Sequence, residues 1–216
     1  MYIAAEIPLI IAVTAGFCGK QARISAEDTP LRRQKGVDLM HVLVVVDMQN
    51  DFVSGSLGTK EAVGIVPSVV GKVAEAVNRG DLVVFTRDTH GPDYLDSREG
   101  RSLPVAHCVR GTEGWEIIPQ LTEYTRGRRV VDKPTFASRE LGELLAGEQE
   151  TSPVETITLV GLCTDICVIS NAMVLRAFLP EAEIVVDAAC CAGVTPESHA
   201  AALAAMRSCQ ILVENG

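Results

Sequence analysis

Three residues of types that do nucleophilic chemistry each come shortly after an apolar run: Asp47, Lys133 and Cys167. A cysteine thiol that gives its proton to a nearby base can attack a carbonyl carbon. Asp47 is placed to be that base, and Lys133 would pair with it and hold positive charge near the thiolate. Taken singly, Asp47 could cap the loop after it, Lys133 could be a solvated surface lysine and Cys167 a small core residue.

The approach to Cys167 carries a further signal. An apolar run ends at Gly161, and Cys163 and Cys167 then enter a helix-like segment. The first N–H groups of a helix favour a thiolate and can stabilise an oxyanion. Backbone N–H groups around Cys163 and Cys167 are therefore candidate oxyanion donors. The competing reading is a redox pair, which predicts a reversible disulfide between these two thiols.

A second constellation lies in the long segment from about 88 to 128, which is rich in Gly, Pro, Asp, His and Arg. A connection of this length without a regular pattern is usually functional. Its Asp88, His90, Glu99 and His107 offer two imidazoles and two carboxylates, a set that suits zinc, manganese or iron. The plainer reading makes the histidines loop-packing residues and Glu99 a solvated side chain.

The elements that would position these residues alternate along the chain. Continuous apolar strands indicate a parallel sheet covered on both faces, and ligands bind beyond the carboxyl ends of such strands. The sequence predicts an α/β fold, a three-layer α/β/α sandwich around a mostly parallel, Rossmann-like sheet of about six strands. The predicted strands are 42–47, 82–86, 129–131, 156–160, 183–187 and 210–213, and the predicted helices are 60–79, 139–147, 165–178 and 196–207.

The predicted domain covers residues 40–216, and residues 1–39 are predicted to be an N-terminal extension, with a true start at Met40 as one alternative. The apolar stretch 3–17 is short for a membrane span and is interrupted by Glu6, which leaves an export signal as the other alternative.

Composition limits the partners and the compartment. The net charge of −9 gives no general attraction to nucleic acid or to an anionic membrane, so a small molecule is the expected partner. Seven cysteines form an odd set without the spacing of a disulfide framework, which predicts a reducing, cytoplasmic location.

Three separated motifs together resemble the isochorismatase-like cysteine hydrolases over nearly all of residues 40–216. They are Val44-Val45-Val46-Asp47-Met48-Gln49-Asn50-Asp51-Phe52, Lys133-Pro134-Thr135-Phe136-Ala137-Ser138 and Gly161-Leu162-Cys163-Thr164-Asp165-Ile166-Cys167-Val168. Two further segments look like the nicotinamidase branch, namely Thr86-Arg87-Asp88-Thr89-His90 and His107-Cys108-Val109-Arg110-Gly111-Thr112.

The resemblance implies Asp47 as general base, Lys133 as its charged partner and Cys167 as nucleophile. It also implies a cis peptide bond between Leu162 and Cys163, which turns backbone N–H groups toward the oxyanion.

For the metal, the resemblance implies Asp88, His90 and His107 as ligands of a divalent ion, zinc first, that holds a pyridine nitrogen. The fourth ligand varies in the family. Glu99 is the choice here, with Asp96 as the competitor.

The chain departs from the branch where an aromatic residue often precedes the last metal histidine, because residues 103–106 read Leu-Pro-Val-Ala. Phe52 and Trp115 are the candidates for the aromatic wall that would bind the substrate.

The implied reaction is hydrolysis of nicotinamide to nicotinate and ammonia through a thioester. The rivals are hydrolysis of an N-carbamoyl or ureido amide, cleavage of isochorismate, and a non-enzymatic metal-binding, partner-binding or redox role. The family commonly forms oligomers, which predicts a homo-oligomer.

Overall fold

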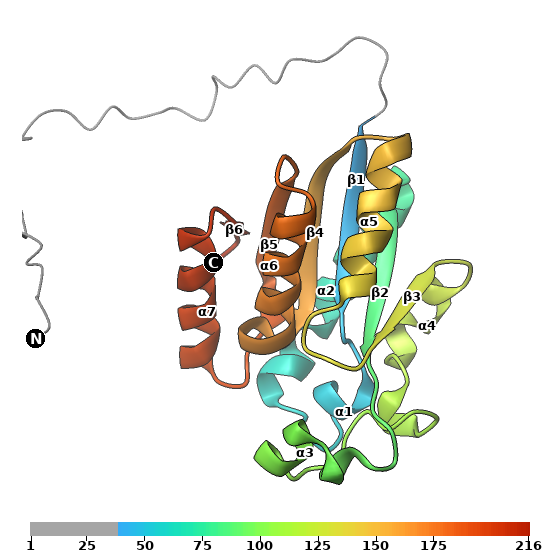
Figure 1. The fold of residues 1–216 in the computed structure, drawn as a ribbon, viewed down its shortest axis with the longest axis vertical. Coiled ribbons are helices and arrows are strands. Elements are labelled where there is room, and N and C mark those ends of the chain that lie inside the picture. Colours follow the sequence, from blue (N-terminus) through green and yellow to red (C-terminus); the bar gives the residue numbers. More distant parts are fainter. Residues whose placement is uncertain (1–38) are drawn as a thin grey trace, which may run out of the picture. The chain divides into compact units, whose positions relative to one another are not determined.

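The computed structural model describes residues 39–216, so the predicted extension lies outside the described residues except for Leu39. Its centre is a six-stranded, all-parallel sheet in the order β3-β2-β1-β4-β5-β6 (Figure 1). The strands are β1 (Met40–Val46), β2 (Leu82–Asp88), β3 (Arg129–Lys133), β4 (Val154–Leu162), β5 (Glu183–Ala192) and β6 (Leu212–Glu214). All six predicted strands are present, and the predicted parallel sheet is confirmed.

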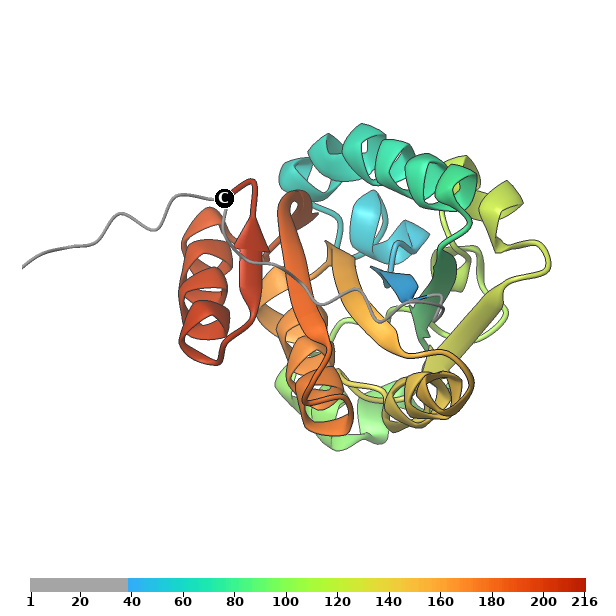
Figure 2. The same cartoon turned by 90° about the horizontal axis from the view of Figure 1, so that it is seen from above.

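Helices cover both faces of this sheet (Figure 2). One face packs against α5 (Arg139–Thr151), α6 (Ile169–Phe178) and α7 (Pro196–Ser208), and the other packs against α2 (Lys60–Arg79) and α4 (Pro119–Thr125). Successive side chains of a strand point to opposite faces. In β1, Val44 and Val46 accordingly join the first layer of the core, and Leu43 and Val45 join the second. The three-layer sandwich is confirmed.

Short polar side chains start the long helices where the sequence places them. Thr59 accepts a hydrogen bond from the Ala62 N–H at the start of α2, and Ser138 accepts one from the Leu141 N–H at the start of α5. Such caps satisfy N–H groups that have no partner within the helix. Among residues 39–216 no helix combines the length and the apolar character that crossing a bilayer needs.

The segment between β2 and β3 contains more helix than the sequence indicates. Four short elements lie there, the 3-10 turns Tyr94–Asp96 (η1) and Glu113–Trp115 (η2) and the helices α3 (Arg98–Ser102) and α4, while α1 (Asn50–Val53) follows β1. Helices of one or two turns are too short to show a 3.6-residue period. Tertiary contacts decide such helices, because isolated ones are unstable.

Two boundaries also differ from the prediction. The strand expected at 183–187 continues to Ala192, because Asp187 is a buried partner of the Lys72 ammonium at 2.6 Å and does not end the strand. The helix expected at 165–178 begins as a π-helical turn, Thr164–Val168 (η3), and becomes α6 only at Ile169.

Candidate active site

The candidate site lies beyond the carboxyl ends of four neighbouring strands. The strand order runs one way from β1 through β2 to β3 and the other way from β1 through β4, so β1 and β4 flank the switch point of the sheet. Asp47 directly follows β1, and Asp88 and Lys133 are the last residues of β2 and β3. Cys167 lies in η3, just after β4. The fold thus brings together residues that are up to 120 positions apart in the sequence.

Lys133 lies between the proposed base and the proposed nucleophile. Its ammonium nitrogen is 2.7 Å from Asp47 Oδ2 and 3.4 Å from Cys167 Sγ. The side chains of Lys133 and Asp47 are both fully buried. The Thr86 hydroxyl donates to Asp47 Oδ1 at 2.7 Å, but no hydrogen bond of good geometry reaches Asp47 Oδ2 within the described part of the chain. Asp47 Oδ2 is therefore an acceptor available to a proton.

Burial and mutual charge set the protonation of these three groups. Burial raises the pKa of Asp47 above its usual range, with the Asp88 charge adding to it and Lys133 opposing it. Burial also raises the pKa of the Cys167 thiol well above its usual value, helped by the Asp47 charge. Burial alone would lower the pKa of Lys133, but the adjacent Asp47 carboxylate outweighs it and raises that pKa. The arrangement favours a neutral thiol beside a lysine that stays charged.

The backbone at the end of β4 and in the segment that follows it has an unusual conformation. Gly161 has a φ of 115°, and a Cβ on it would collide with the Val46 carbonyl oxygen on β1. Glycine tolerates both conditions. The peptide bond between Leu162 and Cys163 is cis, the geometry that the resemblance implies. The Val168 N–H then donates to the Cys163 carbonyl, which makes η3 a π-helical turn. Such turns are frequent at functional sites.

Asn171, which sequence reasoning missed, ties this turn to the segment after β3. Its side-chain amide donates to the Cys167 carbonyl at 2.8 Å and to the Phe136 carbonyl at 3.1 Å. Its carbonyl oxygen accepts from the Ser138 N–H at 2.9 Å. The residue is fully buried. Its only signal in the sequence is its position four residues after Cys167, one helical turn away.

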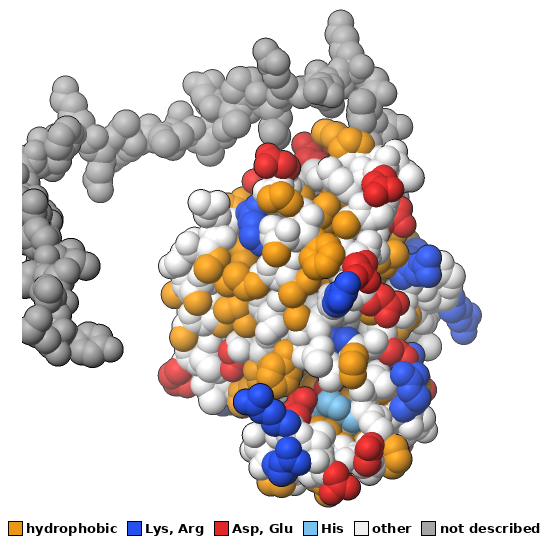
Figure 3. All heavy atoms as spheres, in the orientation of Figure 1, with side chains coloured by type: hydrophobic (Ala, Val, Ile, Leu, Met, Phe, Trp, Pro, Cys, Tyr) orange, Lys and Arg blue, Asp and Glu red, His pale blue; other side chains and the backbone are white. Residues whose placement is uncertain are grey.

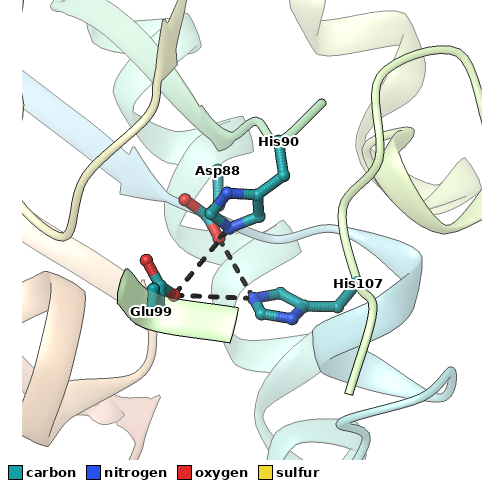
Figure 4. Close-up of side chains that lie close together, drawn as sticks. All are labelled: Asp88, His90, Glu99 and His107. Atoms are coloured by element: carbon teal, nitrogen blue, oxygen red, sulfur yellow. Dashed lines mark hydrogen bonds and ion pairs between the residues drawn. The ribbon is translucent and has the colours of Figure 1, made fainter. Parts of the chain in front are cut away.

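The four predicted metal ligands converge on one point (Figure 4). Their candidate ligand atoms all lie within 4.8 Å of one another. Asp88 Oδ2 is 2.9 Å from His90 Nε2 and 3.4 Å from His107 Nε2, while Glu99 Oε1 is 3.8 Å and 3.9 Å from the same nitrogens. The competitor Asp96 is exposed and does not belong to this group.

The histidines are oriented as metal ligands usually are. The Val105 carbonyl lies 2.8 Å from His107 Nδ1, so this nitrogen donates to the carbonyl and Nε2 faces the cluster. The rings of His90 and His107 also pack against Tyr94, at 4.6 Å and 4.9 Å between ring centroids. Burial would raise the pKa of Asp88, but hydrogen bonds with His107 and His90 and the charge of Lys133 hold it well below its usual range. The donor set fits a divalent cation.

Gln49 binds the backbone of Asp88 at the end of β2, a role that sequence reasoning missed. Its side chain accepts from the Asp88 N–H at 2.7 Å and donates to the Asp88 carbonyl at 2.9 Å. Because Gln49 follows β1 and Asp88 ends β2, this pair of bonds fixes Asp47 and Asp88 relative to each other. The signal was its place directly within the first motif, two residues after Asp47.

A cavity of about 330 Å³ opens between the two groups of residues. Cys167 and Cys163 line it, as do the cluster residues Asp88, Glu99 and His107. Of the two predicted aromatic residues, Phe52 lines the cavity, with its ring centroid 5.5 Å from that of His107.

The prediction for Trp115 needs correction, because Trp115 is not among the lining residues. Its indole N–H donates to the Thr89 hydroxyl at 2.8 Å, and its ring lies 3.6 Å from the Arg87 guanidinium carbon. These contacts hold the ring in the loop packing. Phe136, 47% exposed, is the aromatic residue that lines the cavity beside Phe52 and was missed.

The Isochorismatase domain family matches residues 41–214 of the chain. The Bacillus subtilis protein named an uncharacterised isochorismatase family protein is 31% identical over 173 residues, which cover 74% of this chain and 91% of that protein. The Mycobacterium tuberculosis nicotinamidase/pyrazinamidase is 28% identical over 184 residues, which cover 80% of this chain and 97% of that protein.

Two solved structures have the same fold. The pyrazinamidase of Pyrococcus horikoshii in complex with zinc superposes with a TM-score of 0.69 at 28% identity, covering 80% of this chain and 97% of that one. The N-carbamoylsarcosine amidase of Thermoplasma acidophilum superposes with a TM-score of 0.67 at 27% identity, covering 81% and 95%.

Proposed function

The chain belongs to the isochorismatase family, in its nicotinamidase branch, and from this we propose that it hydrolyses nicotinamide to nicotinate and ammonia through a thioester on Cys167. Family membership and the amidase relatives make it a hydrolase that acts on amides. The cysteine mechanism and the choice of nicotinamide are our proposal. The observation that carries it is one cavity shared by Cys167, with its partners Asp47 and Lys133, and by the cluster around Asp88.

The first step forms the thioester. Asp47 Oδ2 takes the thiol proton, and Sγ of Cys167 bonds to the carboxamide carbon while the electron pair of the carbonyl moves to its oxygen. Lys133 stays charged beside both groups and stabilises the negative charge as it passes between them. Backbone N–H groups of Cys163 and Cys167 would hold the oxyanion. When the oxyanion collapses, the C–N bond breaks and protonated Asp47 gives its proton to the departing ammonia.

The second step regenerates the thiol. A water gives a proton to Asp47 and bonds to the acyl carbon, the C–S bond breaks, and the sulfur of Cys167 recovers the proton. Nicotinate leaves as the product.

The metal cluster explains why a pyridine amide suits the site. Asp88, His90, Glu99 and His107 would hold a divalent ion, zinc first and manganese or iron as alternatives, that supplies a Lewis acid for the pyridine nitrogen. Phe52, which lines the cavity beside His107, would pack against the ring.

The main rival is an N-carbamoyl amide, the class named in the Thermoplasma acidophilum relative. Sarcosine carries a carboxylate, which a binding site normally meets with a lysine or arginine. The cavity is lined by the acidic Asp88 and Glu99, and within residues 39–216 neither a lysine nor an arginine lines it. Isochorismate also carries carboxylates, so it too would lack a basic lining residue to pair with. The lining therefore favours an uncharged amide.

The test measures ammonia released from nicotinamide, pyrazinamide and a panel of N-carbamoyl compounds by the purified protein. We expect release from the two ring amides, and Cys167→Ala should reduce it by at least about a thousandfold with an unchanged circular dichroism spectrum. Cys209→Ala, which alters an exposed free thiol, is the matched control. Substantial activity in Cys167→Ala would refute the nucleophile, and release only from carbamoyl compounds would refute the substrate.

A further inference from the structure

The cavity has more room than the proposed substrate uses. Its volume of about 330 Å³ corresponds to about eleven waters at ~30 Å³ each. Nicotinamide has fewer non-hydrogen atoms than that, and covalent bonds hold them closer together than waters lie. A pyridine carboxamide held between Cys167 and the metal cluster thus leaves part of the cavity unfilled.

The unfilled part lies at the mouth, where the exposed lining residues are apolar apart from Ser102. Leu103, Phe136 and Val194 line the cavity and are 38%, 47% and 51% exposed, whereas Cys167 and His107 at the inner end are buried. We call these three residues the apolar rim. Figure 3 shows this face, on which a hollow lies beside a pale blue histidine, with orange hydrophobic side chains and also red and blue charged side chains at its border. Large side chains that stay exposed around a cavity are typical of a ligand-binding surface.

The rim comes from three separate parts of the chain. Leu103 follows α3, Phe136 lies between β3 and α5, and Val194 lies between β5 and α7. The fold holds two of these backbones in place, since the Val194 N–H donates to Asp165 at 3.1 Å and the Phe136 carbonyl accepts from Asn171 at 3.1 Å. The rim is thus partly preformed, which lowers the entropy lost when a ligand binds.

We propose that the substrate is a pyridine carboxamide with an uncharged apolar substituent, and that the apolar rim binds this substituent. The inference rests on the proposed function. An anionic substituent would find no lysine or arginine among the described residues that line the cavity, and a charged group of either sign would lose its hydration against the apolar rim. Its place is C5 of the ring, since that carbon neighbours neither the nitrogen held at the metal cluster nor the carbon that bears the carboxamide.

The test compares 5-propylnicotinamide with nicotinamide as substrates of the holoenzyme. Each buried methylene is worth about fourfold in binding, so we expect kcat/KM at least about tenfold higher for the propyl compound. Val194→Asn should reduce this ratio severalfold. Val63→Asn is the matched control, because Val63 is also 51% exposed but does not line the cavity.

The outcomes separate the two proposals. Hydrolysis of nicotinamide with a ratio of one or less overturns the apolar-rim proposal and leaves the proposed function standing. If neither amide is hydrolysed, calorimetric binding to Cys167→Ala decides, and tighter binding of the propyl compound supports the rim. An unchanged ratio in Val194→Asn together with a change in subunit number would also overturn the proposal, because the rim would then be an interface.

Discussion

At the scale of single residues, the site depends on one buried lysine whose ammonium group lies close to two carboxylates and a thiol. Lys133 lies 2.7 Å from Asp47, 3.5 Å from Asp88 and 3.4 Å from the sulfur of Cys167. Removing one partner of a buried ion pair leaves a charge without compensation, which is costly, whereas removing both partners often costs little. Stability and catalysis should therefore respond differently to the same substitutions.

Lys133→Met should lower the free energy of unfolding by about 3 kcal/mol or more, because Asp47 and Asp88 lose their shared cation. The double variant Asp47→Asn with Lys133→Met should regain part of this loss. Both variants should release ammonia at least about a hundredfold more slowly, because both lack the lysine cation. The double variant also lacks the base. Urea unfolding and the ammonia assay measure the two effects. Asp47→Asn alone completes the comparison, and a double variant as unstable as the sum of the two single variants would show that the pair is not coupled.

At the scale of elements, the nucleophile depends on how η3 is held. β4 ends at Leu162, one residue after Gly161, and Asn171 fixes the Cys167 carbonyl of η3 to the segment that carries Phe136. A buried amide with its hydrogen bonds satisfied specifies one arrangement of the elements that it joins. Asn171 is thus a positioning residue for both the nucleophile and the apolar rim.

Asn171→Asp should displace this turn, because a carboxylate would face the Cys167 and Phe136 carbonyls and could not donate to them. Two lost donors should cost about 2–4 kcal/mol of unfolding free energy, and kcat for ammonia release should fall more than KM rises. Asn50→Asp is the matched control, since the Asn50 amide donates to a single carbonyl at an exposed position. Wild-type kcat in Asn171→Asp would contradict the positioning role.

At the scale of the whole molecule, the two halves of the sheet meet at the site. β2 and β3 supply Asp88 and Lys133 from one side of β1, and η3, which follows β4, supplies Cys167 from the other. The cluster of Asp88, His90, Glu99 and His107 joins the end of β2 to three residues of the loop that follows it. A metal that binds only the folded chain stabilises all of it by mass action. Whether the chain forms a homo-oligomer stays a prediction that light scattering can test.

Removing the metal with a chelator should lower the midpoint of thermal unfolding, and adding zinc should restore it. A ligand at a hundred times its Kd contributes about 2.7 kcal/mol, which for a domain of this size shifts the midpoint by about 5–10 °C. His107→Ala should abolish the shift. His41→Ala, which removes an exposed histidine outside the cluster, should retain it. An equal zinc shift in both variants would exclude the cluster as the metal site.

Much of the fold could be predicted from the sequence, because apolar residues in long helices and strands follow a pattern that the sequence alone shows. The strands and the long helices α2, α5 and α7 lie close to their predicted positions. The short helices between β2 and β3 could not be predicted in this way. They form where the tertiary structure gives their ends partners, as when the Ser97 hydroxyl accepts from the Gly100 N–H at the start of α3.

The sequence by itself determined which chemistry is available, because residue type and place after a strand are local properties. An aspartate after β1, a lysine at the end of β3 and a cysteine after β4 are residue types that can act as the base, the cation and the nucleophile that we propose. Only the tertiary structure decided the distances between them, the choice of Glu99 over Asp96, and the exclusion of Trp115 from the cavity. Those outcomes depend on contacts between distant segments, and a linear pattern does not contain them.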